Sequence, residues 1–182
     1  MRIILAASDN NLKRMVQDSL TTQGYYVVAE AGNAADVLRK ARSMHVDLVI
    51  METGLPGGRI GEVAMILEED GLAPVLMITG EKDPEIRDFN YILKPVNPYA
   101  LIPAVKSASL AFRKRQELRR EVERLKDQLG TRKSVDIAKG LLMQGRGLSE
   151  DDAHKAMQKM SMDRGLPLKK VAEAIIAAKD NL

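Results

Sequence analysis

The fold of the first half of this chain is decided by the stretch DLVIMETGLPGG, residues 47–58. Its first part, 47–51, is almost wholly apolar, which is typical of a central parallel strand that helices cover on both faces. Glu52 follows directly, and the glycine- and proline-rich run 54–58 predicts a turn. In an open parallel sheet the functional crevice lies beyond the carboxyl ends of the strands. Glu52 is therefore expected at the functional edge of such a sheet.

Strands and helices alternate on both sides of this stretch. Short apolar runs predict four more strands, and apolar residues at helical spacing predict helices between them. Five strands alternating with five helices imply an α/β fold with a doubly wound, five-stranded parallel sheet. The strands are expected at residues 3–7, 25–29, 47–51, 74–78 and 91–93, with clear helical patterns at 12–20, 34–44, 63–67 and from 101 onward.

The strand ends carry motifs of a known family. Residues 1–106 resemble a response-regulator receiver domain in DLVIME with LPG (47–57), MITG (77–80) and ILKP (92–95). The resemblance implies a flavodoxin- or CheY-like fold for this domain. By the same resemblance, Glu52 stands where the family has its phosphoacceptor aspartate. Thr79 and Lys94 stand where the family has its threonine and lysine, and the Lys94–Pro95 peptide bond is expected to be cis.

The first strand departs from the receiver pattern. Ala7 and Ser8 occupy the positions of the family's acidic pair, and Asp9 follows one place late. Phosphoryl transfer to a carboxylate needs Mg²⁺, which prefers carboxylate oxygens, and the longer Glu52 misplaces the nucleophilic oxygen by about 1 Å. We therefore expect a receiver-like domain that conventional aspartate phosphorylation does not regulate. The predicted degenerate phosphorylation pocket consists of Ala7, Ser8, Asp9, Glu52, Thr79 and Lys94.

Two interpretations of Glu52 remain open at this stage. Its carboxylate can lie near Lys94 and Thr79, where a phosphoryl group would sit, so that the receiver is locked or switched by something other than phosphate. Alternatively, Glu52 forms a buried ion pair with Lys94 and mimics nothing. If phosphate is not the input, a regulatory protein partner is the expected signal.

A heptad-like pattern links this domain to the rest of the chain. Apolar residues recur at steps of three and four from Leu101 to Leu129, with Arg115 in one seam position. So narrow a seam favours a coiled-coil helix over 107–130, ended by Gly130, that pairs two chains in a homodimer. Packing of the seam within one chain is the alternative.

The C-terminal segment, 131–182, predicts a small all-α domain of three helices, because glycines at 145–147 and at Gly165 separate three amphipathic stretches. This segment contains the motifs RxxVxxAKGLLM (132–143), GLSExxA (147–153), MDR (162–164) and LxxVAxxI (168–175). With these motifs it resembles the ANTAR family of transcription antitermination regulators. Ser161, where the family usually carries alanine, and Met157, where it usually carries leucine, are expected only to change packing slightly.

The ANTAR resemblance implies binding to paired RNA hairpins in leader transcripts, which prevents a terminator from forming. The charge distribution agrees with binding to RNA, a polyanion, because residues 113–182 carry a net charge of +6 and residues 1–112 a net charge of −3. No aromatic residue follows Phe112, so recognition is expected to use Lys, Arg and close backbone approach rather than stacking on rings. Gly140, which costs about 1 kcal/mol inside a helix, indicates either close RNA approach or close helix packing. The predicted RNA contacts are Arg132, Lys139, Gly140, Lys155, Arg164, Lys169 and Lys170.

Other classes of function are less well supported by the sequence. A DNA-binding response regulator and a protein-binding adaptor remain as alternatives. An enzyme is not expected, because no nucleophile–base pair, glycine-rich phosphate loop or metal cluster is present, and neither a cofactor nor a metal is predicted. We predict a cytoplasmic protein with no membrane partner, because the sequence contains no cysteine, no apolar run near 18 residues in length and no signal peptide.

Overall fold

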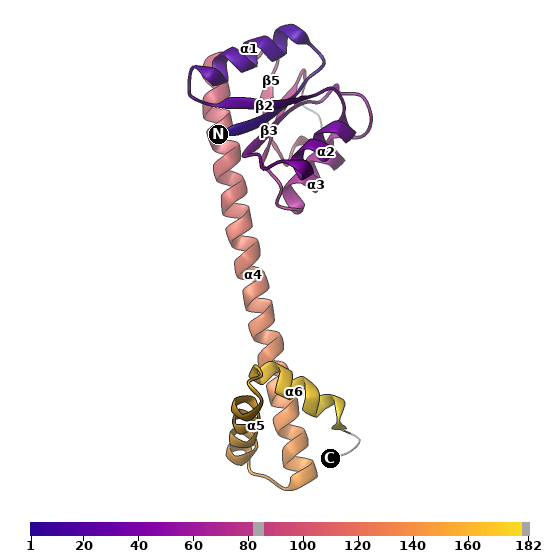
Figure 1. Cartoon of the computed structure of the whole chain (residues 1–182), viewed down its shortest axis with the longest axis vertical. Helices are drawn as coiled ribbons and strands as arrows, with labels where there is room; N and C mark the ends of the chain where they lie inside the picture. The colour runs from indigo at the N-terminus through magenta and orange to yellow at the C-terminus, as the bar shows by residue number, and fades with distance from the viewer. Residues whose placement is uncertain (82–85, 180–182) are drawn as a thin grey trace. The chain divides into compact units, whose positions relative to one another are not determined.

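The computed structural model describes residues 1–81 and 86–179 (Figure 1). The chain divides into two compact units, residues 1–117 and 118–182.

The first unit is built on a five-stranded parallel sheet with strand order β2-β1-β3-β4-β5. The predicted α/β class and parallel sheet are confirmed. The central strand β3 is buried along its whole length, as its apolar sequence predicts. Its carboxyl end therefore places Glu52 at the edge of the sheet where parallel strands present functional side chains. The strands are β1 (Arg2–Ala6), β2 (Tyr26–Ala31), β3 (Leu48–Glu52), β4 (Val75–Thr79) and β5 (Asn90–Leu93).

Helices cover both faces of this sheet (Figure 1). Apolar residues of α2 (Ala34–Ser43) and α3 (Ile60–Glu69) form one core with side chains from alternate positions of β1, β3 and β4. On the opposite face, α1 (Asn10–Thr21) and the first turns of α4 (Pro98–Arg146) form a second core. The two cores together explain why β3 and β4 are apolar along nearly their whole length.

The connection between β4 and β5 differs from the prediction. It spans only residues 80–89, and its described part, residues 80–81 and 86–89, contains no α-helix. The described residues of this connection therefore do not include the helix that was expected there. No amphipathic stretch of helical length lies between these two strands, so the local sequence gives a helix little apolar surface to bury.

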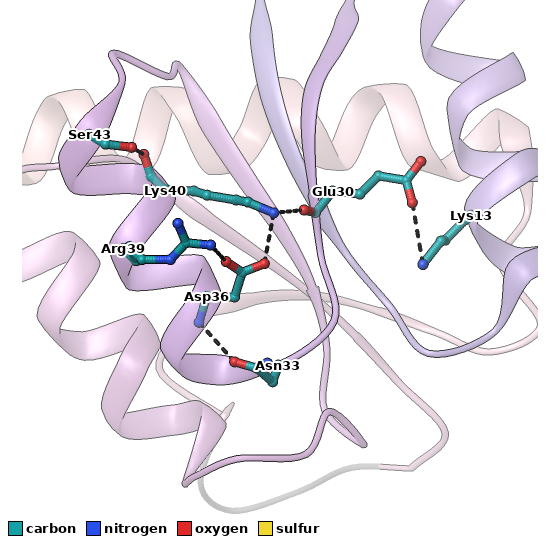
Figure 2. A network of polar contacts seen from close by, with 7 residues as sticks. All are labelled: Lys13, Glu30, Asn33, Asp36, Arg39, Lys40 and Ser43. Atoms are coloured by element: carbon teal, nitrogen blue, oxygen red, sulfur yellow. Dashed lines mark hydrogen bonds and ion pairs between the residues drawn. The ribbon is translucent and has the colours of Figure 1, made fainter.

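A polar network ties the start of α2 to the neighbouring elements (Figure 2). Asn33 caps α2 by accepting a hydrogen bond from the amide of Asp36 at 2.8 Å. Lys40 donates both to the Asp36 carboxylate, at 2.7 Å, and to the main-chain carbonyl of Glu30 at the end of β2. The hydrogen bond from Lys40 lowers the pKa of Asp36. The Glu30 side chain pairs in turn with Lys13 of α1, 3.3 Å away.

Helix α4 corrects the prediction about the arm. It runs without a break from Pro98 to Arg146, through Gly130, where the sequence had predicted an end. One glycine costs a helix only about 1 kcal/mol, which strong helix formers on both sides can offset. The arm and the first helix of the C-terminal unit are therefore one element.

The second unit consists of the end of α4 with α5 (Glu150–Arg164) and α6 (Leu168–Ala177). Ser149 caps α5 by accepting a hydrogen bond from the amide of Asp152. Gly165, which was expected to separate two helices, ends α5 in the left-handed conformation, with φ of 61°. The small core follows the predicted apolar faces. It contains Val135, Ala138, Leu142, Ala153, Met157, Val171, Ala172 and Ile175. None of the described helices in either unit is both long and apolar enough to cross a membrane.

Candidate functional site

The centre of the receiver pocket is the carboxylate of Glu52. One carboxylate oxygen accepts hydrogen bonds from the Ser8 amide at 2.7 Å and from the Ser8 hydroxyl at 2.8 Å. The other forms an ion pair with Lys94. Burial by itself would raise the pKa of Glu52, but the hydrogen bonds from Lys94 and Ser8 outweigh it and lower the pKa. Glu52 is therefore an ionised carboxylate with both oxygens engaged.

Thr79 does not join this cluster. Its hydroxyl donates to the main-chain carbonyl of Glu81 at 2.7 Å, although the residue is buried at the end of β4, as the sequence indicated. The carbonyl of Thr79 accepts from the amide of Lys94 at 2.8 Å, which helps to hold Lys94 at the pocket. Of the two residues expected near the Glu52 carboxylate, Lys94 forms an ion pair with it, whereas the Thr79 hydroxyl bonds elsewhere.

The start of the pocket also differs from that of a metal-binding receiver. Asp9 is the N-cap of α1, where its carboxylate accepts the amide of Asn11 at 2.8 Å, and Ala7 is fully buried. Within residues 1–81 and 86–179, no three His or acidic side chains gather as they would around a metal ion. The Lys94–Pro95 peptide bond is cis, as the resemblance implied.

The predicted seam of α4 divides into two parts. Leu101 and Ala108 belong to the core of the first unit, so the expectation that they continue a partner-facing seam is wrong. Beyond them, four apolar side chains at spacings of four, three and four residues stand exposed. They are Leu118, Val122, Leu125 and Leu129, with exposed fractions of 57%, 47%, 45% and 68%.

Arg115, the charged residue in the seam, has a defined partner that the sequence did not reveal. Its guanidinium lies 2.6 Å from the buried carboxylate of Glu68 at the end of α3. The other Glu68 oxygen accepts the amide of Val75, and the Glu68 carbonyl accepts the side-chain amide of Gln116 at 3.0 Å. These contacts fix α4 against α3 within the first unit. The only signal in the sequence was an arginine where an apolar residue was expected.

Most of the basic side chains named for RNA binding are paired within the second unit. Lys139 is the most enclosed of these lysines: it lies between Asp136, at 3.1 Å, and Glu150, at 2.8 Å. The hydrogen bonds that Lys139 donates to these carboxylates raise its pKa, and the bond to Glu150 is the larger cause. Lys155, Lys169 and Lys170 pair with Asp151, Asp127 and Glu173, respectively.

Arginines are the more available cations. In the part of the chain that the structure describes, Arg132 and Arg164 are exposed and take part in no ion pair. Arg146, at the end of α4, has the same properties and was missed by sequence reasoning. Because α4 is continuous, Arg132, Lys139 and Arg146 are spaced by seven residues on one face of it. A Cβ built at Gly140 meets no atom within 4 Å, so close packing inside the chain does not explain this glycine.

Two family models match the chain. The response regulator receiver domain matches residues 3–106, and the ANTAR domain matches residues 123–176. Both matches agree with the resemblances identified from the motifs. The ANTAR match begins within the continuous part of α4, so it contains part of the exposed seam as well as the three-helix core.

Similar proteins and structures support both halves. The transcriptional regulatory protein PdtaR of Mycobacterium tuberculosis is 34% identical over 183 residues, which cover 96% of this chain and 89% of that protein. The aliphatic amidase regulator of Pseudomonas aeruginosa is 26% identical over 50% of this chain and 47% of its own length. Among solved structures, a CheY-like receiver domain from Methanospirillum hungatei matches with 24% identity and a TM-score of 0.54. The match covers 63% of this chain and 97% of that domain's chain. That likeness shows the receiver fold.

Proposed function

This chain belongs to the response regulators that join a receiver domain to an ANTAR domain, and on that basis we propose that it is a transcription antitermination regulator that binds hairpin RNA in leader transcripts. The observation that carries the proposal is the ANTAR match over 123–176, in the basic part of the chain. Binding at nascent transcripts implies a cytoplasmic location.

The character of the second unit supports RNA as the ligand. A unit without aromatic side chains must read RNA through phosphates, shape and close backbone approach. Exposed Arg132 and Arg164 supply guanidinium groups that have no ion-pair partner among residues 1–81 and 86–179, and the open space beside Gly140 lets a backbone come near the helix. Lys139 contributes by exchanging Glu150 for a phosphate, and we retain Gly140, Lys155, Lys169 and Lys170 as the other proposed contacts.

For the receiver domain, we propose an input other than aspartate phosphorylation. Ser8 and Lys94 already engage both oxygens of Glu52, which holds the carboxylate in place and makes it a weaker nucleophile toward a phosphodonor. The negative charge of the Glu52 carboxylate keeps Lys94 in the pocket through their ion pair. A regulatory protein partner is then the proposed source of the signal.

The exposed seam supports a homodimer. Four large apolar side chains, 118 to 129, stand on one stripe of α4 at coiled-coil spacing. A second copy of the same stripe is a self-complementary partner, as two-fold symmetry requires. The proposed domain division is 1–106 for the receiver, 107–130 for the pairing segment and 131–182 for the RNA-binding part.

A competition experiment tests the central proposal. The full chain is titrated into a labelled tandem-hairpin RNA, with unlabelled hairpin RNA or duplex DNA as competitor. Displacement by RNA alone is expected, whereas displacement by duplex DNA would indicate a DNA-binding regulator. Lys139→Ala should weaken RNA binding and lower the salt slope by about one, because one phosphate contact is lost. Lys159→Ala, an exposed lysine of the same unit that we do not assign to RNA, serves as the matched control.

A further inference from the structure

The second unit contains a small apolar cavity that the proposed function does not yet use. Its volume is about 180 Å³, and it lies between the end of α4, α5 and α6. The buried side chains of Leu142, Val171 and Ile175 line it. Pockets for drug-sized ligands occupy roughly 300–1,000 Å³. This cavity therefore has room for one small planar ring system and little more.

Positive charge surrounds the cavity. Arg146, Arg164 and Lys170 line it together with the apolar residues, and no acidic side chain does so among the lining residues described. Lys170 is paired with Glu173 at 2.9 Å, but the two arginines have no such partner within the described chain. A ligand that is apolar and flat at one end and anionic at the other complements both features.

The wall of the cavity is held in place by hydrogen bonds. Gly165 ends α5 in the left-handed conformation, and the Leu166 amide donates to the carbonyl of Ser161 at 3.0 Å. The hydroxyl of Ser161 donates to the carbonyl of Leu166 at 2.5 Å. Leu166, which lines the cavity, is thus fixed by a serine at the position where the ANTAR family usually has alanine. Serine at position 161 therefore adds a hydrogen bond to the cavity wall, which the expected small change in packing did not include.

We propose that this cavity binds one unstacked nucleobase from the loop of the RNA hairpin, with Arg146 and Arg164 holding the adjoining phosphates. The inference rests on the proposed RNA binding and adds how the loop is read. Single-stranded loops are recognised by splaying bases out against apolar surfaces or arginine planes. This unit has no aromatic ring, so the available substitute is an aliphatic slot beside two guanidinium groups that pair with no described side chain.

The test fills the cavity without changing charge. Ala174 is exposed and lines the cavity, whereas Ala177 is exposed on the same helix and does not line it. The probe is an RNA hairpin selected from a loop-randomised pool on the wild-type full chain, with 2-aminopurine placed at each loop position in turn. Ala174→Leu should weaken binding about tenfold, the size expected for a lost base contact, and leave the salt slope unchanged. Ala177→Leu should bind as wild type.

Further readouts separate the two proposals. At one loop position, 2-aminopurine fluorescence should change on binding to wild type and not to Ala174→Leu, while Arg164→Gln should lower the salt slope by about one. Melting curves confirm that the variants are folded. If wild type binds the hairpin and Ala174→Leu binds equally well, the base pocket is wrong and RNA binding stands. If no hairpin is selected at all, the proposed function itself fails.

Discussion

Replacement of Glu52 by glutamine tests the receiver pocket most directly. The amide oxygen of the introduced side chain can still accept the hydrogen bonds of Ser8, but its NH₂ group faces the ammonium of Lys94, so one charge-assisted bond is lost. Such bonds contribute about 1.5–3 kcal/mol. Lys94 keeps 37% of its side chain exposed and can turn to water, which reduces the cost to about 1–2 kcal/mol. For a unit of this size, that loss lowers the melting temperature by about 4–8 °C.

The assay must observe the first unit alone. All four tyrosines, Tyr25, Tyr26, Tyr91 and Tyr99, lie in residues 1–117, and the chain has no tryptophan. Near-ultraviolet circular dichroism of tyrosine therefore reports melting of the receiver unit within the full chain. Adding Lys94→Met to Glu52→Gln should recover part of the lost stability, because it removes the unpaired ammonium group.

The dependence on pH gives a second test of the same pair. The pKa of Glu52 is lowered in the folded state, so its contribution is present above about pH 4.3, the ordinary value for glutamate. This contribution is lost as the pH falls through the folded pKa. The difference between wild type and Glu52→Gln should therefore shrink below about pH 4. Equal melting temperatures at pH 7, or a difference that does not change on acidification, would refute the account of an ionised, paired Glu52.

Other outcomes follow from the same structure. A small phosphodonor with Mg²⁺ should leave the wild-type chain unlabelled, and stable labelling at Glu52 would contradict the proposed input. Leu125→Glu should convert the proposed dimer to a monomer in sedimentation, whereas Arg120→Glu, off the seam, should not; a monomeric wild type would exclude the dimer. Ser149→Ala should destabilise the second unit by about 1 kcal/mol in far-ultraviolet melting, because the cap of α5 is lost. Arg115→Ala should lower the receiver melting temperature, because it removes an ion-pair partner of the buried Glu68 carboxylate; an unchanged melt would show that this ion pair adds no stability.

The positions of the strands, the buried character of β3 and the gathering of Glu52, Ser8 and Lys94 at one edge could all be predicted from the sequence. Apolar period and turn residues are local properties, and parallel strands bring their carboxyl ends together by topology alone. The two family motifs likewise occupy short stretches. The capping of α5 by Ser149 and its end at Gly165 were predictable for the same reason, since each depends on residues a few positions apart.

Other features were decided only by tertiary structure. Gly130 is a helix interior rather than an end because its neighbours on both sides sustain the helix, which no single position reveals. Arg115 pairs with Glu68 across 47 positions of sequence. Arg146, Arg164 and Lys170 meet around one cavity only when three helices pack. Sequence patterns express what a residue prefers among its near neighbours, whereas the partner of a charge or the wall of a cavity depends on segments that folding alone brings together.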